Sequence, residues 1–185
     1  DCGNSGKFSV NVVGSSPTLG LFFGGGPSVS ANKKIQFITI ASTGNGQDFG
    51  DMDAAKNGIL GGTASSTRGI VAGGYVGSPG AVVSTIIYYT SSSAGGATDF
   101  GDLTAARRSI ASNSSRTRGI WACGSNQKST IDFVTIASTG NATSFGTALV
   151  SRDDPDACAS ETRMCIGGGY STVIDIEYIL SLIHI

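Results

Sequence analysis

Short runs of alternating apolar and polar residues predict β-strands along most of the chain. Between residues 108 and 149 the pattern predicts four strands, over 108–113, 118–124, 130–137 and 144–149, with serine, asparagine and glycine between them. Several short strands bounded by such turn-forming residues are typical of an all-β fold. Glycine, serine and threonine are spread throughout the chain and are poor helix formers, so a helical bundle is excluded.

The predicted strands recur as a sequence repeat. The third strand of each unit begins at an isoleucine, and a phenylalanine follows 14 residues later in the fourth strand, at Ile35 and Phe49, Ile86 and Phe100, and Ile131 and Phe145. Seven residues after each phenylalanine stands a basic residue, Lys56, Arg107 or Arg152, and a further set of anchors is Arg68, Arg118 and Arg163. A fourth unit is expected to begin at Ile174, which gives steps of 51, 45 and 43 residues from position 35. Repeats of this length with four strands each are typical of propeller blades.

The repeat resembles the kelch family. The shared features are a diglycine at the end of the second strand, before Tyr75 and Tyr170, an aromatic residue in the fourth strand and the basic residue that follows it. The chain departs from that family where phenylalanine replaces the fourth-strand tryptophan and where Cys123-Gly124 replaces the diglycine.

The resemblance implies a β-propeller of four-stranded antiparallel blades within residues 1–179. We expect about four blades: partial strands over 7–52, two full blades, and one truncated near Ile179. Because unclosed blades leave strand edges open, a fragment of a larger propeller is favoured over a closed four-bladed ring.

Residues 180–185, Leu-Ser-Leu-Ile-His-Ile, differ from the repeat. They resemble the translated end of a transposase-based sequencing adapter, and we interpret them as a tail of that origin. A genuine apolar strand end is the alternative. His184, the single histidine of the chain, lies in this segment.

Composition excludes several functions. Charged residues make up only 14% of the chain, the net charge is −1, and no block is rich in lysine or arginine, so a nucleic-acid partner is not expected. No apolar run approaches the ~20 residues that span a bilayer. The single histidine, His184, lies in the segment interpreted as an adapter tail. The repeats therefore offer neither the imidazole ligands of a copper oxidase nor the base of a Ser–His or Cys–His pair. We therefore predict a chain that is not an enzyme, with no cofactor and no metal.

Other repeated residues have two interpretations each. The clustered aspartates are predicted to cap turn amides, with a calcium site as the alternative; they are Asp48, Asp51, Asp53, Asp99, Asp102, Asp153, Asp154 and Asp156. The repeated cations are predicted to pair with these aspartates or with blade-edge carbonyls, and an anion-binding ring is the alternative. Cys158 and Cys165 fall on the first and second strands of the last blade, where a disulfide could join them.

Length variation concentrates in the connection between the second and third strands. From Arg68, Arg118 and Arg163 to the next isoleucine the chain runs 18, 13 and 11 residues. This connection repeats on one face of a propeller, and insertions on one face commonly mark a binding surface. We predict non-catalytic recognition of a glycan or protein surface there, with solvent loops that bind nothing as the alternative. The candidate residues are Asn32, Lys33, Lys34, Tyr75, Ser78, Asn126, Gln127, Lys128 and Tyr170.

The Ser-Thr-Gly-Asn segment followed by Asp-Phe-Gly-Asp, at residues 42–51, also resembles kelch-like repeats of tailed phages. That resemblance implies an extracellular or virion setting, such as a tail fibre, with a receptor surface, further blades or copies of the chain itself as partners. An enzyme whose catalytic residues lie in other blades, and a structural spacer, are the alternatives.

Overall fold

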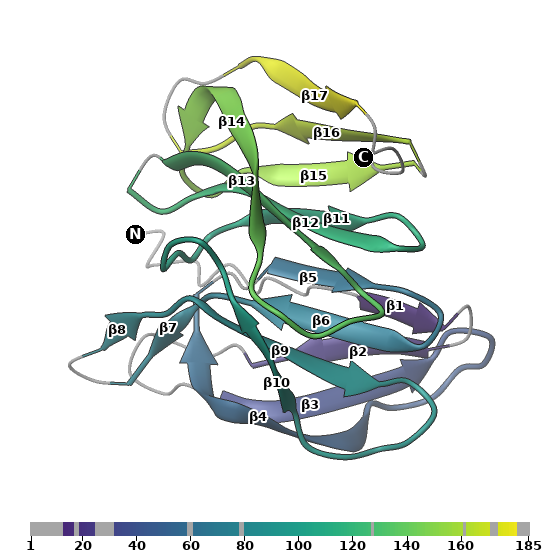
Figure 1. Cartoon of the computed structure of the whole chain (residues 1–185). Helices are drawn as coiled ribbons and strands as arrows, with labels where there is room; N and C mark the ends of the chain where they lie inside the picture. The colour runs from purple at the N-terminus through teal and green to yellow at the C-terminus, as the bar shows by residue number, and fades with distance from the viewer. Residues whose placement is uncertain are drawn as a thin grey trace, which may run out of the picture.

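The structure is a computed structural model that describes residues 13–16, 19–24, 32–58, 61–77, 80–126, 128–160, 162–170 and 174–180. The regular secondary structure of these residues consists of β-strands, which form four small antiparallel sheets set in a ring (Figure 1). The predicted all-β propeller is confirmed, and the described part has four blades. It contains no helix long and apolar enough to cross a membrane.

Each blade is an antiparallel meander in chain order. Blade A contains β1 (Val13–Ser16), β2 (Leu19–Phe23), β3 (Asn32–Thr39) and β4 (Gln47–Asn57). Blade B contains β5 (Gly61–Ala64), β6 (Arg68–Ala72), β9 (Thr85–Thr90) and β10 (Thr98–Asp102). Blade C contains β11 (Ala111–Ser114), β12 (Arg118–Gly124), β13 (Lys128–Thr135) and β14 (Thr143–Arg152). Blade D contains β15 (Asp156–Ala159), β16 (Arg163–Gly167) and β17 (Ile176–Leu180). A hairpin of β7 (Tyr75–Val76) and β8 (Ala81–Val82) is inserted between β6 and β9 and pairs with β4.

The strand register corrects two predictions. Blade A has all four strands rather than partial ones, and the fourth unit starts two residues later than expected. Arg163 pairs with Leu180 as Arg118 pairs with Thr135, so Ile176 takes the place predicted for Ile174. Ile174 and Ile176 are two residues apart, and a strand pattern with a period of two fits both registers equally well. The last step of the repeat is therefore 45 residues, and the connection after Arg163 is as long as the one after Arg118.

Apolar side chains form a separate core between each pair of successive blades. In β6, Val71 packs toward blade A with Leu21 and Phe49, whereas its neighbour Ile70 packs toward blade C with Trp121. Successive residues of a strand point to opposite faces, so an inner blade is apolar on both sides. This accounts for continuous apolar runs such as residues 70–72 inside otherwise alternating strands.

A buried cation crosses each junction between blades. Arg107 follows blade B, and it pairs with Asp132 of β13 and donates to the Cys123 and Thr130 carbonyls at 3.2 and 2.7 Å. Arg152 is the last residue of β14 in blade C, and in the same way it pairs with Glu177 of β17 and donates to the Gly168 carbonyl. Lys56 lies near the end of β4 in blade A and contacts Asp53 of the same strand and the Thr85 hydroxyl of blade B. The predicted structural role is confirmed for these three cations, although Asp132 and Glu177 are strand residues rather than the turn aspartates.

The diglycine gives the buried arginines a place to bind. Gly73, Cys123 and Gly168 have φ values of 72°, 61° and 66°, and the glycine after each also has a positive φ. This left-handed conformation favours glycine, and it turns the Cys123 and Gly168 carbonyls toward Arg107 and Arg152. Cys123 adopts the same conformation although it is not glycine, so Cys123-Gly124 takes the place of the diglycine in blade C.

Candidate functional site

The connections between second and third strands lie on one side of the molecule, at the left of Figure 1, where the β7–β8 hairpin projects. In an antiparallel meander these connections come at the opposite end of the second strand from the hairpin between the first and second strands. We call this side the loop face, and it carries the predicted site residues that the structure describes. The other two, Ser78 and Gln127, fall outside the described residues.

Two tyrosines occupy equivalent positions on the loop face, seven residues after Arg68 and Arg163. Tyr75 is half-buried, with the Arg108 guanidinium 5.1 Å from its ring centroid and the Gly80 backbone against the ring. Tyr170 is 78% exposed. Tyr75 therefore anchors the inserted hairpin, whereas the Tyr170 side chain is open to solvent.

The remaining predicted site residues of the described chain, Asn32, Lys33, Lys34, Asn126 and Lys128, are all exposed. Arg108 contacts the second-to-third-strand connections of both blade B and blade C. Its carbonyl accepts a hydrogen bond from the Ser125 amide at 2.8 Å, and its side chain stacks on Tyr75. Asn126, next to Ser125, has a φ of 63° that fixes its place in the turn. Tyr75, Arg108 and Asn126 are thus brought together on one surface.

The lysines of blade A are engaged by aspartates of β4. Lys33 and Lys34 lie 3.2 and 3.1 Å from the Asp51 carboxylate, and Lys34 lies 3.5 Å from Asp48. The hydrogen bond to Asp51 raises the pKa of Lys34, and that from Lys34 lowers the pKa of Asp51. This cluster of alternating charge would hold polar groups in a ligand, although surface pairs of this kind contribute little to stability.

The aspartates do not form a calcium site among the described residues, where no group of three acidic, cysteine or histidine side chains could hold a metal. Asp48 and Asp156 accept backbone amides, of Gly50 and Ala157, as predicted. Asp51 and Asp53 instead pair with lysines, and Asp102 accepts the Ser84 hydroxyl.

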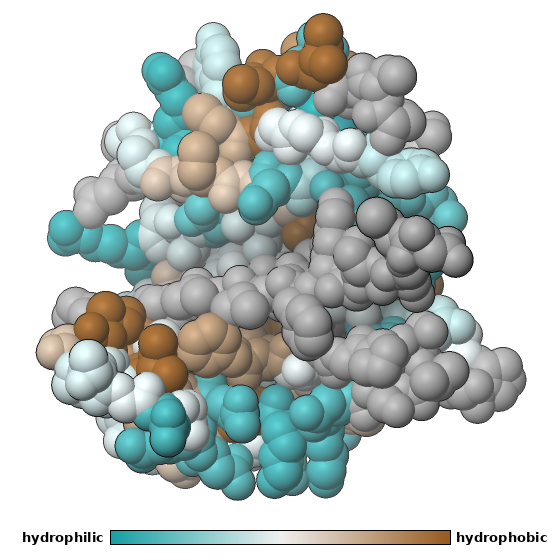
Figure 2. Space-filling view, turned by 180° about the vertical axis from the view of Figure 1, so that it is seen from behind, coloured by the Kyte–Doolittle hydropathy of each residue, from teal (hydrophilic) through white to brown (hydrophobic). Residues whose placement is uncertain are grey.

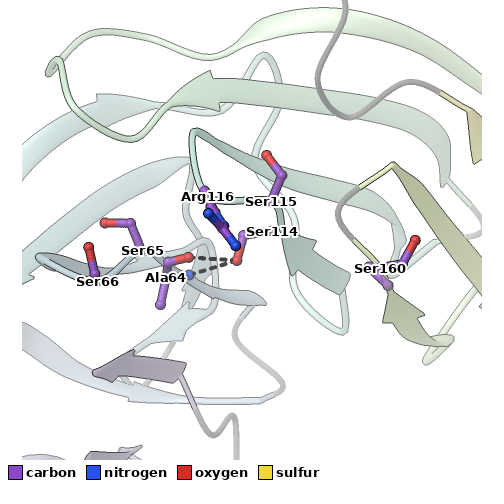
Figure 3. Close-up of a pocket in the computed structure, with 8 residues that line it drawn as sticks. Ala64, Ser65, Ser66, Ser114, Ser115, Arg116 and Ser160 are labelled. Atoms are coloured by element: carbon purple, nitrogen blue, oxygen red, sulfur yellow. Dashed lines mark hydrogen bonds between the residues drawn. The ribbon is translucent and has the colours of Figure 1, made fainter. Parts of the chain in front are cut away.

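The opposite face contains a hollow that the sequence analysis missed. It has a volume of about 580 Å³ and lies where the first-to-second-strand hairpins of blades B, C and D converge (Figure 3). Its lining is Ala64, Ser65, Ser66, Ser114, Ser115, Arg116, Ala159 and Ser160. A serine recurs two residues before the threonine of each Thr-Arg anchor, at Ser65, Ser115 and Ser160. This pattern could have indicated the hollow, but serine in these positions was interpreted only as a turn-forming residue.

Most hydroxyls of this serine hollow already have structural partners. Ser65 accepts the Thr67 and Arg68 amides, and Ser115 accepts the Thr117 and Arg118 amides. Ser114 bonds both the amide and the carbonyl of Ala64, which ties blade C to blade B (Figure 3). The described lining of the hollow therefore consists mainly of hydroxyls and one guanidinium.

Comparison with known proteins does not indicate a function. No protein-family model matches the chain, and no curated protein matches it significantly.

Proposed function

We propose that this propeller is a non-catalytic recognition module that binds a glycan or a protein surface through its loop face. The observation that carries the proposal is the position of the length variation. The connection after Arg68 is five residues longer than those after Arg118 and Arg163, and the added chain forms the β7–β8 hairpin on that face. The spacing between repeat residues is nearly the same in other parts of the blades, and it differs in the connection where contact with a variable partner is expected.

The exposed groups suit polar ligands. Tyr170 supplies an aromatic face on which a sugar ring or an apolar side chain can stack, and aromatic rings are enriched where proteins bind partners. Asn126, Lys128 and the Lys33–Lys34 cluster supply donors for hydroxyl and carboxylate oxygens. An extracellular or virion setting fits such a surface, and the phage resemblance of the repeat favours it.

A glycan array probed with the labelled whole chain tests the proposal. We expect signal from a limited set of glycans, reduced at least fivefold by Tyr170→Ala and by Asn126→Gly. Glycine relieves the positive φ at position 126, so that variant removes the amide without straining the turn. Parallel binding to bacterial cells, intact or treated with protease, tests a protein receptor.

Matched controls lie in the serine hollow on the opposite face. Ser66→Ala and Arg116→Ala are expected to leave binding unchanged. Absence of signal on both the array and the cells would refute recognition. Loss of signal in the hollow variants alone would move the site to the other face and refute the assignment to the loops.

A further inference from the structure

Among the described residues, the junction between blades C and D shows no counterpart of two contacts that the other two junctions share. At the first junction, the Gly95 and Ala97 amides of blade B donate to the Phe49 and Asp51 carbonyls of blade A at 2.8 and 2.9 Å. At the second, the Gly140 and Ala142 amides of blade C donate to the Phe100 and Asp102 carbonyls of blade B at 2.7 and 2.8 Å. Each docking segment is the loop between a blade's third and fourth strands.

A glycine in the fourth strand receives each docking loop. Gly50 and Gly101 have φ values of 150° and 144°, and a Cβ on either would overlap the carbonyl oxygen of Gly95 or Gly140. Gly146 of blade C has the same conformation, with a φ of 147°, but a Cβ there would meet nothing within 4 Å among the described residues. Blade C thus offers the same receptor, formed by the Phe145 and Thr147 carbonyls around Gly146, with no described segment upon it.

The edge strand of blade D also has an aromatic ring without the partner that its equivalents have among the described residues. In blades B and C an arginine stacks on a third-strand ring, and that ring meets a fourth-strand phenylalanine edge-on; these groups are Arg68, Tyr88 and Phe100 in one blade and Arg118, Phe133 and Phe145 in the other. In blade D, Arg163 lies 5.0 Å from the ring centroid of Tyr178, but Tyr178 is 60% exposed. Its described sheet has three strands, with β17 at the edge.

The surface around this edge is apolar. Ile174 and Ile176 are 91% and 77% exposed, and Figure 2 shows hydrophobic atoms gathered at the top of the molecule, the end at which Figure 1 places β17. In blades B and C the residue equivalent to Ile176 is paired with the glycine of the fourth strand, Ile86 with Gly101 and Ile131 with Gly146.

We propose that this edge binds one kind of partner, an extended segment that carries the repeat's own loop and fourth strand and belongs to a further copy of the repeat. The segment pairs with β17, places its phenylalanine on Tyr178 and donates two loop amides to the Phe145 and Thr147 carbonyls. The strand edge of β17 and the Phe145 and Thr147 carbonyls lie outside the candidate residues of the loop face, so the test of this proposal and that of the proposed function fail separately.

A fluorescent peptide with the sequence of residues 136–150 tests this proposal by anisotropy with the whole chain. We expect saturable binding and slower amide hydrogen exchange in β17. A control peptide with proline in place of the glycine and alanine that correspond to Gly140 and Ala142 lacks both donors. It should bind about tenfold more weakly or worse, since two hydrogen bonds are lost.

Protein variants give a second control. Tyr178→Ala should weaken peptide binding at least fivefold, whereas Tyr170→Ala, which removes an exposed tyrosine on the loop face, should not. Equal binding of the two peptides, or equal effects of the two tyrosine variants, overturns the proposal. Dimerisation of the chain that the peptide fails to dissociate also overturns it, because the occupant would then be a second whole copy.

Discussion

The buried cations provide a graded test of how the blades are held together. Replacing each by methionine keeps an unbranched side chain of moderate length but removes the charge and leaves the acidic partner behind. The carboxylate partners of Arg107, Arg152 and Lys56 have exposed side-chain fractions of 0%, 10% and 34%. A carboxylate left without its cation costs more free energy the less water can reach it.

Arg107→Met is therefore expected to lower the free energy of unfolding by about 3–5 kcal/mol, the usual cost of breaking a buried ion pair. Asp132 would keep only the Thr104 amide and hydroxyl as donors. Arg152→Met should cost about 2 kcal/mol, because Glu177 keeps the Leu149 and Val150 amides and some water. Lys56→Met should cost about 1 kcal/mol or less.

Urea unfolding followed by fluorescence measures all three, because the single tryptophan, Trp121, is buried between blades B and C. Where Arg107→Met proves too unstable to study, the double variant Arg107→Met/Asp132→Asn should recover at least half of the lost stability. The side-chain amide oxygen that Asp132→Asn introduces can still accept a hydrogen bond from Thr104, and it carries no buried charge. An equal loss in all three single variants, or no recovery in the double variant, would refute the reasoning.

Three further outcomes are expected. The Tyr89 hydroxyl is buried with no hydrogen-bond partner among the described residues, so Tyr89→Phe should keep or raise stability at pH 7, by about 1 kcal/mol at most. Burial raises the pKa of Tyr89 above its ordinary value of 10.0, so above pH 10 the hydroxyl ionises more readily in the unfolded chain than in the folded one. The wild type should therefore lose stability as the pH rises past 10, and Tyr89→Phe should lose less. Urea unfolding at pH 7 and above pH 10 measures this difference. Cys158 and Cys165 pair directly across β15 and β16, within Cα reach of a disulfide, so mild oxidation should remove two hydrogens from the chain in mass spectrometry, and Cys165→Ser should prevent it. Gly101→Ala should lower the melting temperature more than Gly146→Ala, because both strain the same φ but only the former overlaps a docked loop.

The fold could be predicted because the repeat reports it several times. A single unit of short strands is ambiguous, but the recurrence of isoleucine, phenylalanine and a basic residue in step fixes the strand order within a blade. Register was harder, because Ile174 and Ile176 fit the same apolar pattern and only the pairing with Arg163 separates them. Strand pairing is a tertiary property, and periodicity of two leaves it undetermined.

The candidate site was predicted only in part. The length of a connection can be read from the sequence, so the loop face was found. The different roles of Tyr75 and Tyr170 could not be, because they depend on Arg108, which reaches Tyr75 from a distant part of the chain. The serine hollow was missed for the same reason, since hairpins from three blades line it.

Most residues that define the repeat make contacts within or between blades. The basic residue fills the space beneath the diglycine carbonyl, the anchor arginine stacks on the third-strand ring, and the fourth-strand glycine receives the next blade's loop. Groups held this way are desolvated or already hydrogen-bonded, so a ligand would have to displace a partner before it could use them. Recognition is therefore expected from residues that the repeat leaves unspecified, such as Tyr170, Asn126 and the β7–β8 hairpin. A blade array can change those residues without weakening the junctions that hold it together.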